Sequence, residues 1–288
     1  MTDPVFPPSG ATDCHTHVAG SAPRYPMVSP RAYTPSEATP AMMRAMMDRV
    51  GTERIVLVQM SVFGVDNSCM LDAMEALGPC SRGVVQLAED VAGEELDRLH
   101  RLGVRGIRVN LNTTGLNDPG LARERLAVTA AQCARNGWHL QLFTSPAVIA
   151  SLSDVLHALP VPVVLDHFGL LPTHARGGTA ERAALSLLGS GKGWVKISGT
   201  YRLDDPTATD AIAGLARDLH AANPGNIVWG SDWPHSPPHA GSAQIAPPAA
   251  PYRDIDPAAM LDTIRAWFDA PEVRQAVLTD NPARLYDF

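Results

Sequence analysis

The sequence predicts a (β/α)8 barrel, the TIM-barrel fold, formed as a single domain by residues 1–288. Two observations carry this prediction. Eight short and nearly continuous apolar runs alternate with longer amphipathic segments, a pattern typical of parallel strands that are covered by helices. The length of 288 residues also suits eight βα units, because such barrels occupy roughly 250 residues. An open doubly wound sheet is the alternative, but no Gly-x-Gly-x-x-Gly turn follows the first run.

The elements follow one another regularly along the chain. The predicted strands cover residues 11–17, 54–60, 83–87, 106–111, 138–143, 161–166, 193–198 and 226–231. Amphipathic spacing predicts helices over residues 39–50, 68–77, 93–102, 119–136, 145–158, 179–188, 210–222, 257–269 and 271–278. Two long proline-bearing loops, residues 18–35 and 234–256, follow the first and last strands. We expect both loops to lie over the mouth of the barrel.

Composition and charge exclude several classes of partner. The formal net charge is -7, and acidic and basic residues are spread along the chain without a Lys/Arg block, so nucleic acid is not an expected partner. No apolar run is long enough to predict a membrane span. The four cysteines are scattered and form no Cys-x-x-Cys pair, which indicates reduced thiols and a cytoplasmic protein. A homo-oligomer is compatible with the sequence.

Polar side chains gather at the ends of several predicted strands. His15 and His17 end the first strand, and because residues i and i+2 share a face of a strand, both should project the same way with Asp13 one layer behind. His167 follows the sixth strand, and Asp232 follows the eighth. The carboxyl ends of the strands carry the active site in this fold, so these side chains should meet there and either hold a metal or polarise a substrate oxygen.

These motifs resemble the amidohydrolase superfamily, which has a His-x-His pair on its first strand, a late-strand histidine and an aspartate on the eighth strand. Local phrases are similar to the lactonase branch, which includes 2-pyrone-4,6-dicarboxylate lactonase, sugar-acid lactonases and a galactarolactone isomerase. The phrases are QMS (59–61), RGIRVN (105–110), DHFG (166–169), KISGTYR (196–202) and NPARLY (281–286). The resemblance runs from about residue 11 to residue 288. It implies an amidohydrolase-type barrel that acts as a lactone hydrolase in aromatic or sugar-acid catabolism.

The chain departs from the family pattern at two places. Metal-dependent members usually add a histidine from the fifth strand, and many add a lysine or glutamate from the fourth; here those strands offer Gln141, Arg108 and Asn110. A binuclear site is therefore not expected, and the favoured interpretation is that no cofactor is required. One divalent metal, such as zinc, held by His15, His17 and Asp232 is left open. The dicarboxylate lactonase also carries a second basic residue shortly after the arginine, where this chain has residues 112–114 (NTT), so the doubly carboxylated pyrone is not the favoured substrate.

The resemblance implies a role for each candidate residue. Asp232 is the expected general base, with capping of the next loop as the alternative. His15, His17 and His167 would hold the lactone carbonyl, unless they are satisfied core residues. Arg108 and Arg202 would hold a carboxylate of an anionic lactone; the alternatives are an internal salt bridge of Arg108 with Asp13 or Asp166 and surface exposure of Arg202. Further candidate substrate contacts are Ser61, Asn110, Gln141 and Tyr201, with His235 reaching the site and His239 solvated.

The predicted function is hydrolysis of a carboxylate-bearing lactone by water that Asp232 activates. A lactone isomerase on the same scaffold is the first alternative, because it could use the same base without net addition of water. A mononuclear zinc amidohydrolase or decarboxylase is the second. A non-catalytic binding barrel is the third, although the presence of His15, His17 and Asp232 argues against it.

Overall fold

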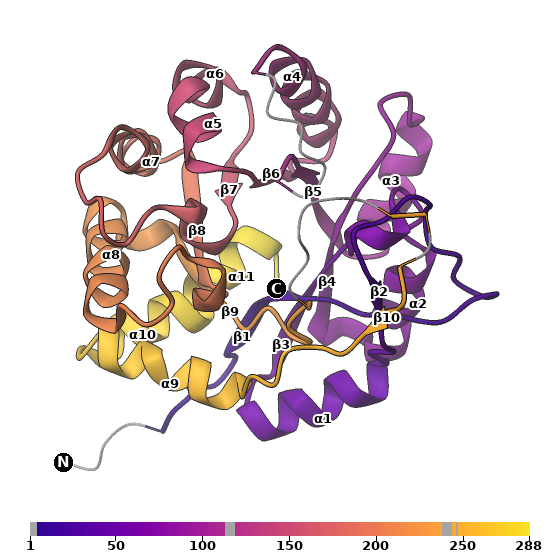
Figure 1. Ribbon diagram of the computed structural model, residues 1–288, viewed down its shortest axis with the longest axis horizontal. Helices are drawn as coiled ribbons and strands as arrows, with labels where there is room; N and C mark the ends of the chain where they lie inside the picture. The colour runs from indigo at the N-terminus through magenta and orange to yellow at the C-terminus, as the bar shows by residue number, and fades with distance from the viewer. Residues whose placement is uncertain (1–4, 113–118, 238–243, 246) are drawn as a thin grey trace.

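The computed structural model describes residues 5–112, 119–237, 244–245 and 247–288. Eight parallel strands pair in chain order, and Figure 1 shows them in the middle of the molecule with helices around them. They are β1 (Thr12–Thr16), β3 (Arg54–Val58), β4 (Ser81–Val85), β5 (Val104–Asn110), β6 (His139–Phe143), β7 (Val163–Leu165), β8 (Gly193–Ser198) and β9 (Ile227–Gly230). A parallel bridge between Thr16 and Trp233 brings the last strand back to the first. The predicted (β/α)8 barrel is confirmed.

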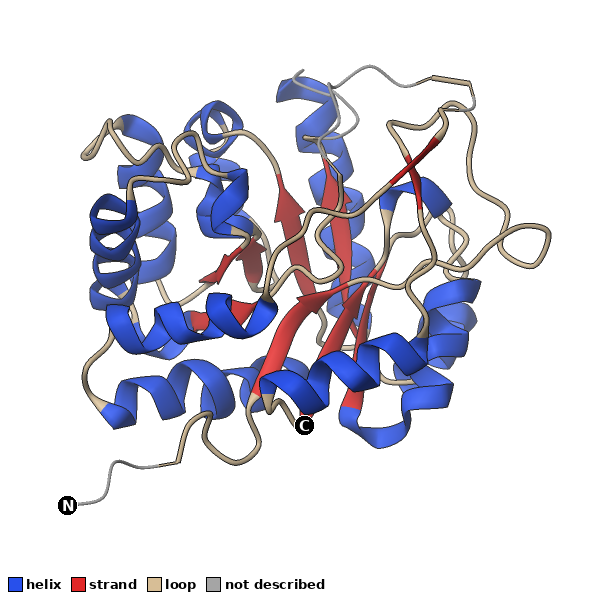
Figure 2. Cartoon of the chain, turned by 60° about the horizontal axis from the view of Figure 1, so that its bottom comes forward, coloured by secondary structure: helices blue, strands red, loops and turns tan. Residues whose placement is uncertain are grey.

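Helices cover the outside of the barrel, as Figure 2 shows. They are α1 (Pro40–Val50), α2 (Ser68–Leu77), α3 (Gly93–Arg101), α4 (Pro119–Arg135), α5 (Pro146–Ser151), α6 (Ser153–Ala158), α7 (Thr179–Gly189), α8 (Thr209–Ala222), α9 (Pro257–Trp267), α10 (Pro271–Gln275) and α11 (Asn281–Tyr286). The helix predicted over residues 145–158 is two helices, because the backbone leaves helical geometry at Leu152. The helix predicted over residues 271–278 continues through a π-helical segment into α11. Among the described residues, no helix combines the length and apolarity needed to cross a membrane.

Two apolar layers hold the barrel together. The outer layer lies between strands and helices and includes Leu57, Ile107 and Leu142. The inner layer fills the barrel and consists of Cys14, Val56, Val58, Val84, Val164, Trp194, Val228 and Tyr286. Tyr286 comes from α11, and Arg82 at the start of β4 donates a hydrogen bond to its carbonyl oxygen. The amino-terminal end of the barrel is thus closed by apolar packing, and polar side chains occupy the opposite end.

The first strand departs from the regular alternation that the sequence analysis assumed. The pairing of β1 with β3 shifts register between Asp13 and Thr16, and such an irregularity changes which side chains face the barrel interior. Cys14 consequently packs in the inner layer. The Asp13 carboxylate accepts hydrogen bonds from the backbone N–H groups of His15 and Ser231, so it ties β1 to the segment that follows β9.

The two long loops meet at the mouth of the barrel. The short strands β2 (Thr34–Pro35) and β10 (Ala249–Ala250) form a parallel pair, which Figure 1 shows beside α2. The hydroxyl groups of Tyr33 and Ser236 lie 3.1 Å apart, and the Tyr252 hydroxyl donates to the Ser36 carbonyl oxygen. The sequence did not predict this pairing, because neither loop carries a strand-like apolar run. His239, which was expected to be solvated, lies outside the described residues.

Candidate active site

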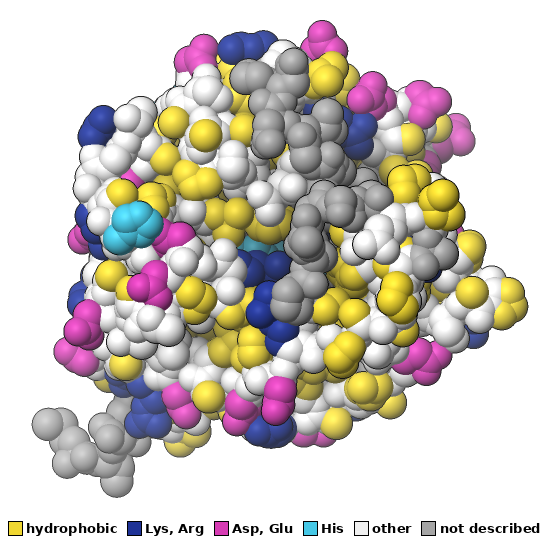
Figure 3. All heavy atoms as spheres, in the orientation of Figure 1, with side chains coloured by type: hydrophobic (Ala, Val, Ile, Leu, Met, Phe, Trp, Pro, Cys, Tyr) yellow, Lys and Arg dark blue, Asp and Glu magenta, His cyan; other side chains and the backbone are white. Residues whose placement is uncertain are grey.

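A pocket opens at the carboxyl ends of the strands. Its lining contains five of the predicted site residues together with side chains from both long loops: His17, Ser61, Arg108, Asn110, Arg202, Tyr33, Met60, Phe143 and Ser236. Figure 3 shows Lys and Arg side chains around a hollow near the middle of this face, with histidine atoms at its base. The described lining contains two arginines and no carboxylate, so its exposed polar groups suit an anionic ligand.

Asp232 is fully buried and contacts two residues of the pocket lining, His17 and Arg202. Its Oδ2 atom accepts hydrogen bonds from Arg202 Nε at 2.5 Å and from the Tyr201 hydroxyl at 2.6 Å. Its Oδ1 atom lies 3.2 Å from His17 Nε2. Burial opposes ionisation, but the charge of Arg202 and the neighbouring histidines hold the pKa of Asp232 well below its usual value. Asp232 is consequently a carboxylate at neutral pH.

The backbone at Asp232 and at the facing Gly199 has left-handed conformations that allow these close contacts. Asp232 has a φ of 63°, a left-handed conformation that is uncommon for residues other than glycine and is frequent at functional sites. Gly199 faces it with a φ of 56°, and a Cβ atom there would come within 2.8 Å of His167 Nδ1 and 3.3 Å of Asp232 Oδ2. Only glycine lets the loop after β8 approach the two side chains so closely.

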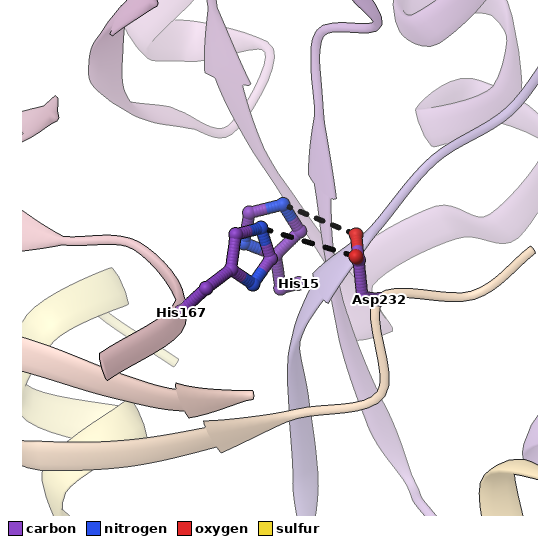
Figure 4. A group of neighbouring side chains, drawn as sticks. All are labelled: His15, His167 and Asp232. Carbon is purple, nitrogen blue, oxygen red and sulfur yellow. Dashed lines mark ion pairs between the residues drawn. The ribbon is translucent and has the colours of Figure 1, made fainter. Parts of the chain in front are cut away.

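Three histidines surround the Asp232 carboxylate, and Figure 4 shows His15 and His167 pointing toward it. The distances to its oxygens are 3.6 Å from His15 Nε2 and 3.9 Å from His167 Nε2. Burial lowers the pKa of His15 well below its usual value and that of His167 to about 4, so both rings are neutral. His17 differs, because its Nδ1 faces the Val58 carbonyl oxygen at 2.8 Å. Its Nε2 can donate to Asp232 only if the ring also carries a second proton.

A second buried carboxylate, Asp166, lies below the histidines. It accepts hydrogen bonds from Arg108 Nε at 3.3 Å and from Gln141 Nε2 at 3.1 Å, and Lys196 Nζ lies 3.8 Å from it. Burial opposes ionisation, but the contacts with His15, Lys196 and Arg108 hold the pKa of Asp166 well below its usual value. The internal salt bridge between Arg108 and Asp166, an alternative in the sequence analysis, is present, although Arg108 also lines the pocket.

Lys196 is the main residue that the sequence analysis missed. It is fully buried in β8, and its Nζ donates to the Cys14 carbonyl oxygen at 2.8 Å and to Gln141 Oε1 at 2.7 Å. Burial lowers its pKa to about 8. A signal was available, because Lys196 lies two residues after Trp194 and shares its face of β8, which is the face of the inner layer. A charged side chain inside a barrel needs partners.

Besides Arg108, most of the predicted site residues fall into three groups in the structure, and His235 lies apart from them. His15, His17, His167, Tyr201 and Arg202 surround Asp232. Ser61 and Asn110 line the pocket above it, whereas Gln141 is fully buried between Lys196 and Asp166. His235 is buried with its ring 5.9 Å from that of Tyr201.

The group His15, His167 and Asp232 could hold a metal ion, because one donor atom from each lies within 4.8 Å of the others. Two imidazoles and a carboxylate are suitable zinc ligands. The sequence analysis named His17 in place of His167, and His17 is also in contact with Asp232. The donors fit a single divalent ion in kind and in spacing, but Asp232 Oδ2 would have to be shared with the Arg202 guanidinium.

Comparison with known proteins places this geometry in a family. A 2-pyrone-4,6-dicarboxylate hydrolase of Comamonas testosteroni is 32% identical over 97% of this chain and 90% of its own length. A 4-sulfomuconolactone hydrolase of Rhizobium radiobacter is 30% identical over 97% of this chain and 90% of its own length. A crystal structure from Pseudomonas putida, provisionally named a 2-pyrone-4,6-dicarboxylic acid hydrolase, superposes with a TM-score of 0.78 at 30% identity, covering 96% of this chain and 97% of its own. The amidohydrolase family model matches residues 12–288, and the chain belongs to the amidohydrolase family.

Proposed function

We propose that this protein is a hydrolase that opens a lactone bearing at least one anionic group. The observation that carries the proposal is an ionised, fully buried carboxylate, Asp232, that contacts Arg202 in the lining of a pocket also lined by Arg108. The two relatives support it, because both names denote hydrolases of anionic lactones. Asp232 supplies a base, and the arginines supply a site for a negative charge.

Arg202 has a double role in this scheme. Its Nε holds Asp232 Oδ2 at 2.5 Å, which leaves the other N–H groups of its guanidinium fork for the anionic group of the substrate. A substrate carboxylate or sulfonate would share the positive charge that otherwise stabilises ionised Asp232. Binding of the anion would thus raise the basicity of Asp232 just before it has to accept a proton.

The chemical step follows from the arrangement around Asp232. His15 and His167 lie beside Asp232 and are the donors for the lactone carbonyl oxygen, on which negative charge develops. Asp232 removes a proton from water as the water oxygen bonds to the carbonyl carbon, giving a tetrahedral intermediate. The C–O bond of the ring then breaks, and protonated Asp232 returns the proton to the leaving oxygen. One water is added, and Asp232 ends as it began.

A metal would add to this chemistry without replacing it. Zinc held by His15, His167 and Asp232 would polarise the carbonyl and lower the pKa of a bound water. The favoured scheme requires no metal, because the His and Arg side chains already supply positive charge and hydrogen-bond donors at the same place. Metal analysis of the purified protein, with activity measured before and after chelation, tests this part of the proposal.

A panel of lactones tests the function itself. The panel pairs carboxylated and sulfonated lactones with uncharged partners, such as the methyl ester of the same acid, and follows proton release and product mass. We expect turnover of an anionic lactone, a product heavier by one water, and at least tenfold lower kcat/KM for the ester. A product of unchanged mass would assign a lactone isomerase instead. Equal rates for acid and ester would overturn the anionic-substrate proposal.

A further inference from the structure

The buried Lys196 has no role in the scheme above, yet it lies directly against a site histidine. Its Nζ is 3.4 Å from His15 Nδ1 and meets the geometry of a hydrogen bond. Its two other hydrogen bonds go to the Cys14 carbonyl oxygen and Gln141 Oε1. An ammonium group has three N–H bonds and no lone pair. All three donors of Lys196 are thus used, and one of them is directed at His15.

His15 Nδ1 has a competing neighbour. Asp166 Oδ1 lies 3.3 Å from the same nitrogen and would accept a proton from it. Within the described part of the chain, however, Asp166 Oδ1 makes no hydrogen bond, because the carboxylate is oriented through its other oxygen toward Arg108 and Gln141. The contact of this ring nitrogen with the Lys196 ammonium meets hydrogen-bond geometry at 3.4 Å. Its contact with Asp166 Oδ1 at 3.3 Å does not, although the two atoms are equally near.

Whether His15 Nδ1 pairs with Lys196 or with Asp166 decides which ring nitrogen carries the proton. If Lys196 donates to Nδ1, that nitrogen offers its lone pair, and the single proton of the neutral ring is on Nε2. Nε2 is buried and has no hydrogen-bond partner among the described residues, and the nearest carboxylate oxygen of Asp232 is 3.6 Å away. A buried N–H without a partner is costly unless a ligand completes it.

We propose that Lys196 is a positioning residue that holds His15 in its Nε2–H tautomer, so that this N–H is available to the lactone carbonyl oxygen. The tautomer is a property of the free protein, while its use in catalysis rests on the proposed function. The same tautomer has no lone pair on Nε2, so His15 would have to move its proton before binding a metal through that atom.

The NMR spectrum of the ligand-free protein tests the tautomer directly. The protein is labelled with 15N in its histidine rings, and the His15 signals are identified by their loss in His15→Gln. We expect the pattern of an Nε2–H tautomer at neutral pH. An Nδ1–H pattern, a doubly protonated ring or zinc coordination through Nε2 in the purified protein would overturn the proposal.

Substitution of Lys196 tests the cause. In Lys196→Met the hydrogen-bond donor to His15 Nδ1 is lost. The ring should then shift toward the Nδ1–H tautomer, which can donate a hydrogen bond to Asp166 Oδ1. With a lactone substrate, kcat should fall about 10²- to 10³-fold, the usual cost of losing one donor to a developing oxyanion, while KM changes only a few-fold. Lys192→Met is the matched control, because Lys192 is the only other lysine of the chain and donates to the His157 and Leu159 carbonyl oxygens away from the site.

The outcomes separate the two proposals. An unchanged His15 tautomer in folded Lys196→Met would overturn the positioning role, whatever the activity. A wild-type Nε2–H signal without turnover of any lactone would contradict the proposed function and leave the tautomer assignment standing. Should Lys196→Met fail to fold, Asp166→Asn provides the second test, because the His15 signals should keep the Nε2–H pattern when the competing acceptor is weakened.

Discussion

Two buried aspartates lie on opposite sides of the His15 ring and have different surroundings. Asp232 follows β9 and is 3.6 Å from His15 Nε2, while Asp166 follows β7 and is 3.3 Å from His15 Nδ1. Both are almost completely buried, and both have pKa values held well below the usual range. Burial and ionisation alone therefore do not distinguish Asp232, the proposed base, from Asp166, for which we propose a structural role.

The origin of the partners makes the difference. Asp232 is held by Tyr201 and Arg202, which lie in the short turn after β8, and Arg202 lines the pocket. Asp166 is held mainly by side chains that point inward from the strands: Arg108, Gln141 and Lys196. A carboxylate whose partners lie on loops can exchange them for a substrate, whereas one whose partners lie on strands orders the barrel interior.

The largest expected effect comes from Asp232→Asn. The amide keeps the size of the side chain but cannot accept a proton from water, so turnover should fall by at least about 10³-fold, within the range seen for loss of general-base catalysis. The measurement is kcat on whichever lactone the wild type hydrolyses, with circular dichroism to verify the fold. Turnover close to that of the wild type would place the base elsewhere.

Asp166→Asn should act on stability more than on chemistry. It leaves Arg108 and Lys196 buried without a counter-charge, and breaking a buried ion pair costs about 3–5 kcal/mol of unfolding free energy. Asp72→Asn is the matched control, because the Arg24–Asp72 pair is 73% and 44% exposed and should contribute at most about 1 kcal/mol. Urea unfolding measures the loss of unfolding free energy in each variant. Equal losses would mean that the buried Asp166 stabilises the fold no more than the exposed Asp72 does.

His139 should make stability depend on pH below neutrality. Burial lowers the pKa of His139 to about 3 from 6.5, so between these values the unfolded chain binds the proton and the folded protein does not. Stability from this group is therefore present at pH 7 and is lost as pH falls, by about 2 kcal/mol between pH 7 and pH 5. Between pH 7 and pH 5, the unfolding free energy of His139→Phe should fall by about 2 kcal/mol less than that of the wild type. Equal falls in the two proteins would mean that His139 is not the group responsible.

Ser61→Ala should produce the smallest effect. Ser61 lines the pocket and belongs to neither carboxylate group, so its hydroxyl can affect substrate binding but not the two ion-pair networks. Loss of one neutral hydrogen bond, worth about 1 kcal/mol, should raise KM about fivefold with little change in kcat. A fall in kcat comparable to that of Asp232→Asn would mean that Ser61 takes part in the chemical step.

The sequence predicted those parts of the site that depend on strand order and strand ends. His15, His17, His167 and Asp232 meet because a barrel brings the carboxyl ends of its strands together. The irregular features could not be read in the same way, because they depend on contacts between distant segments. The register shift in β1 depends on its pairing with β3. The buried Lys196 ammonium depends on the Cys14 carbonyl oxygen, a hydrogen-bond acceptor 182 residues away in the chain.

The joined loops at the barrel mouth have a consequence for the evolution of specificity. The loop after β1 and the loop after β9 share the β2–β10 pair and the contact between Tyr33 and Ser236, and these last two residues also line the pocket. An insertion or deletion in one loop would remove the other's partner, so the two segments should vary together among homologues that accept different ligands. Grafting a new specificity onto this scaffold would accordingly require both loops to be transferred as a pair.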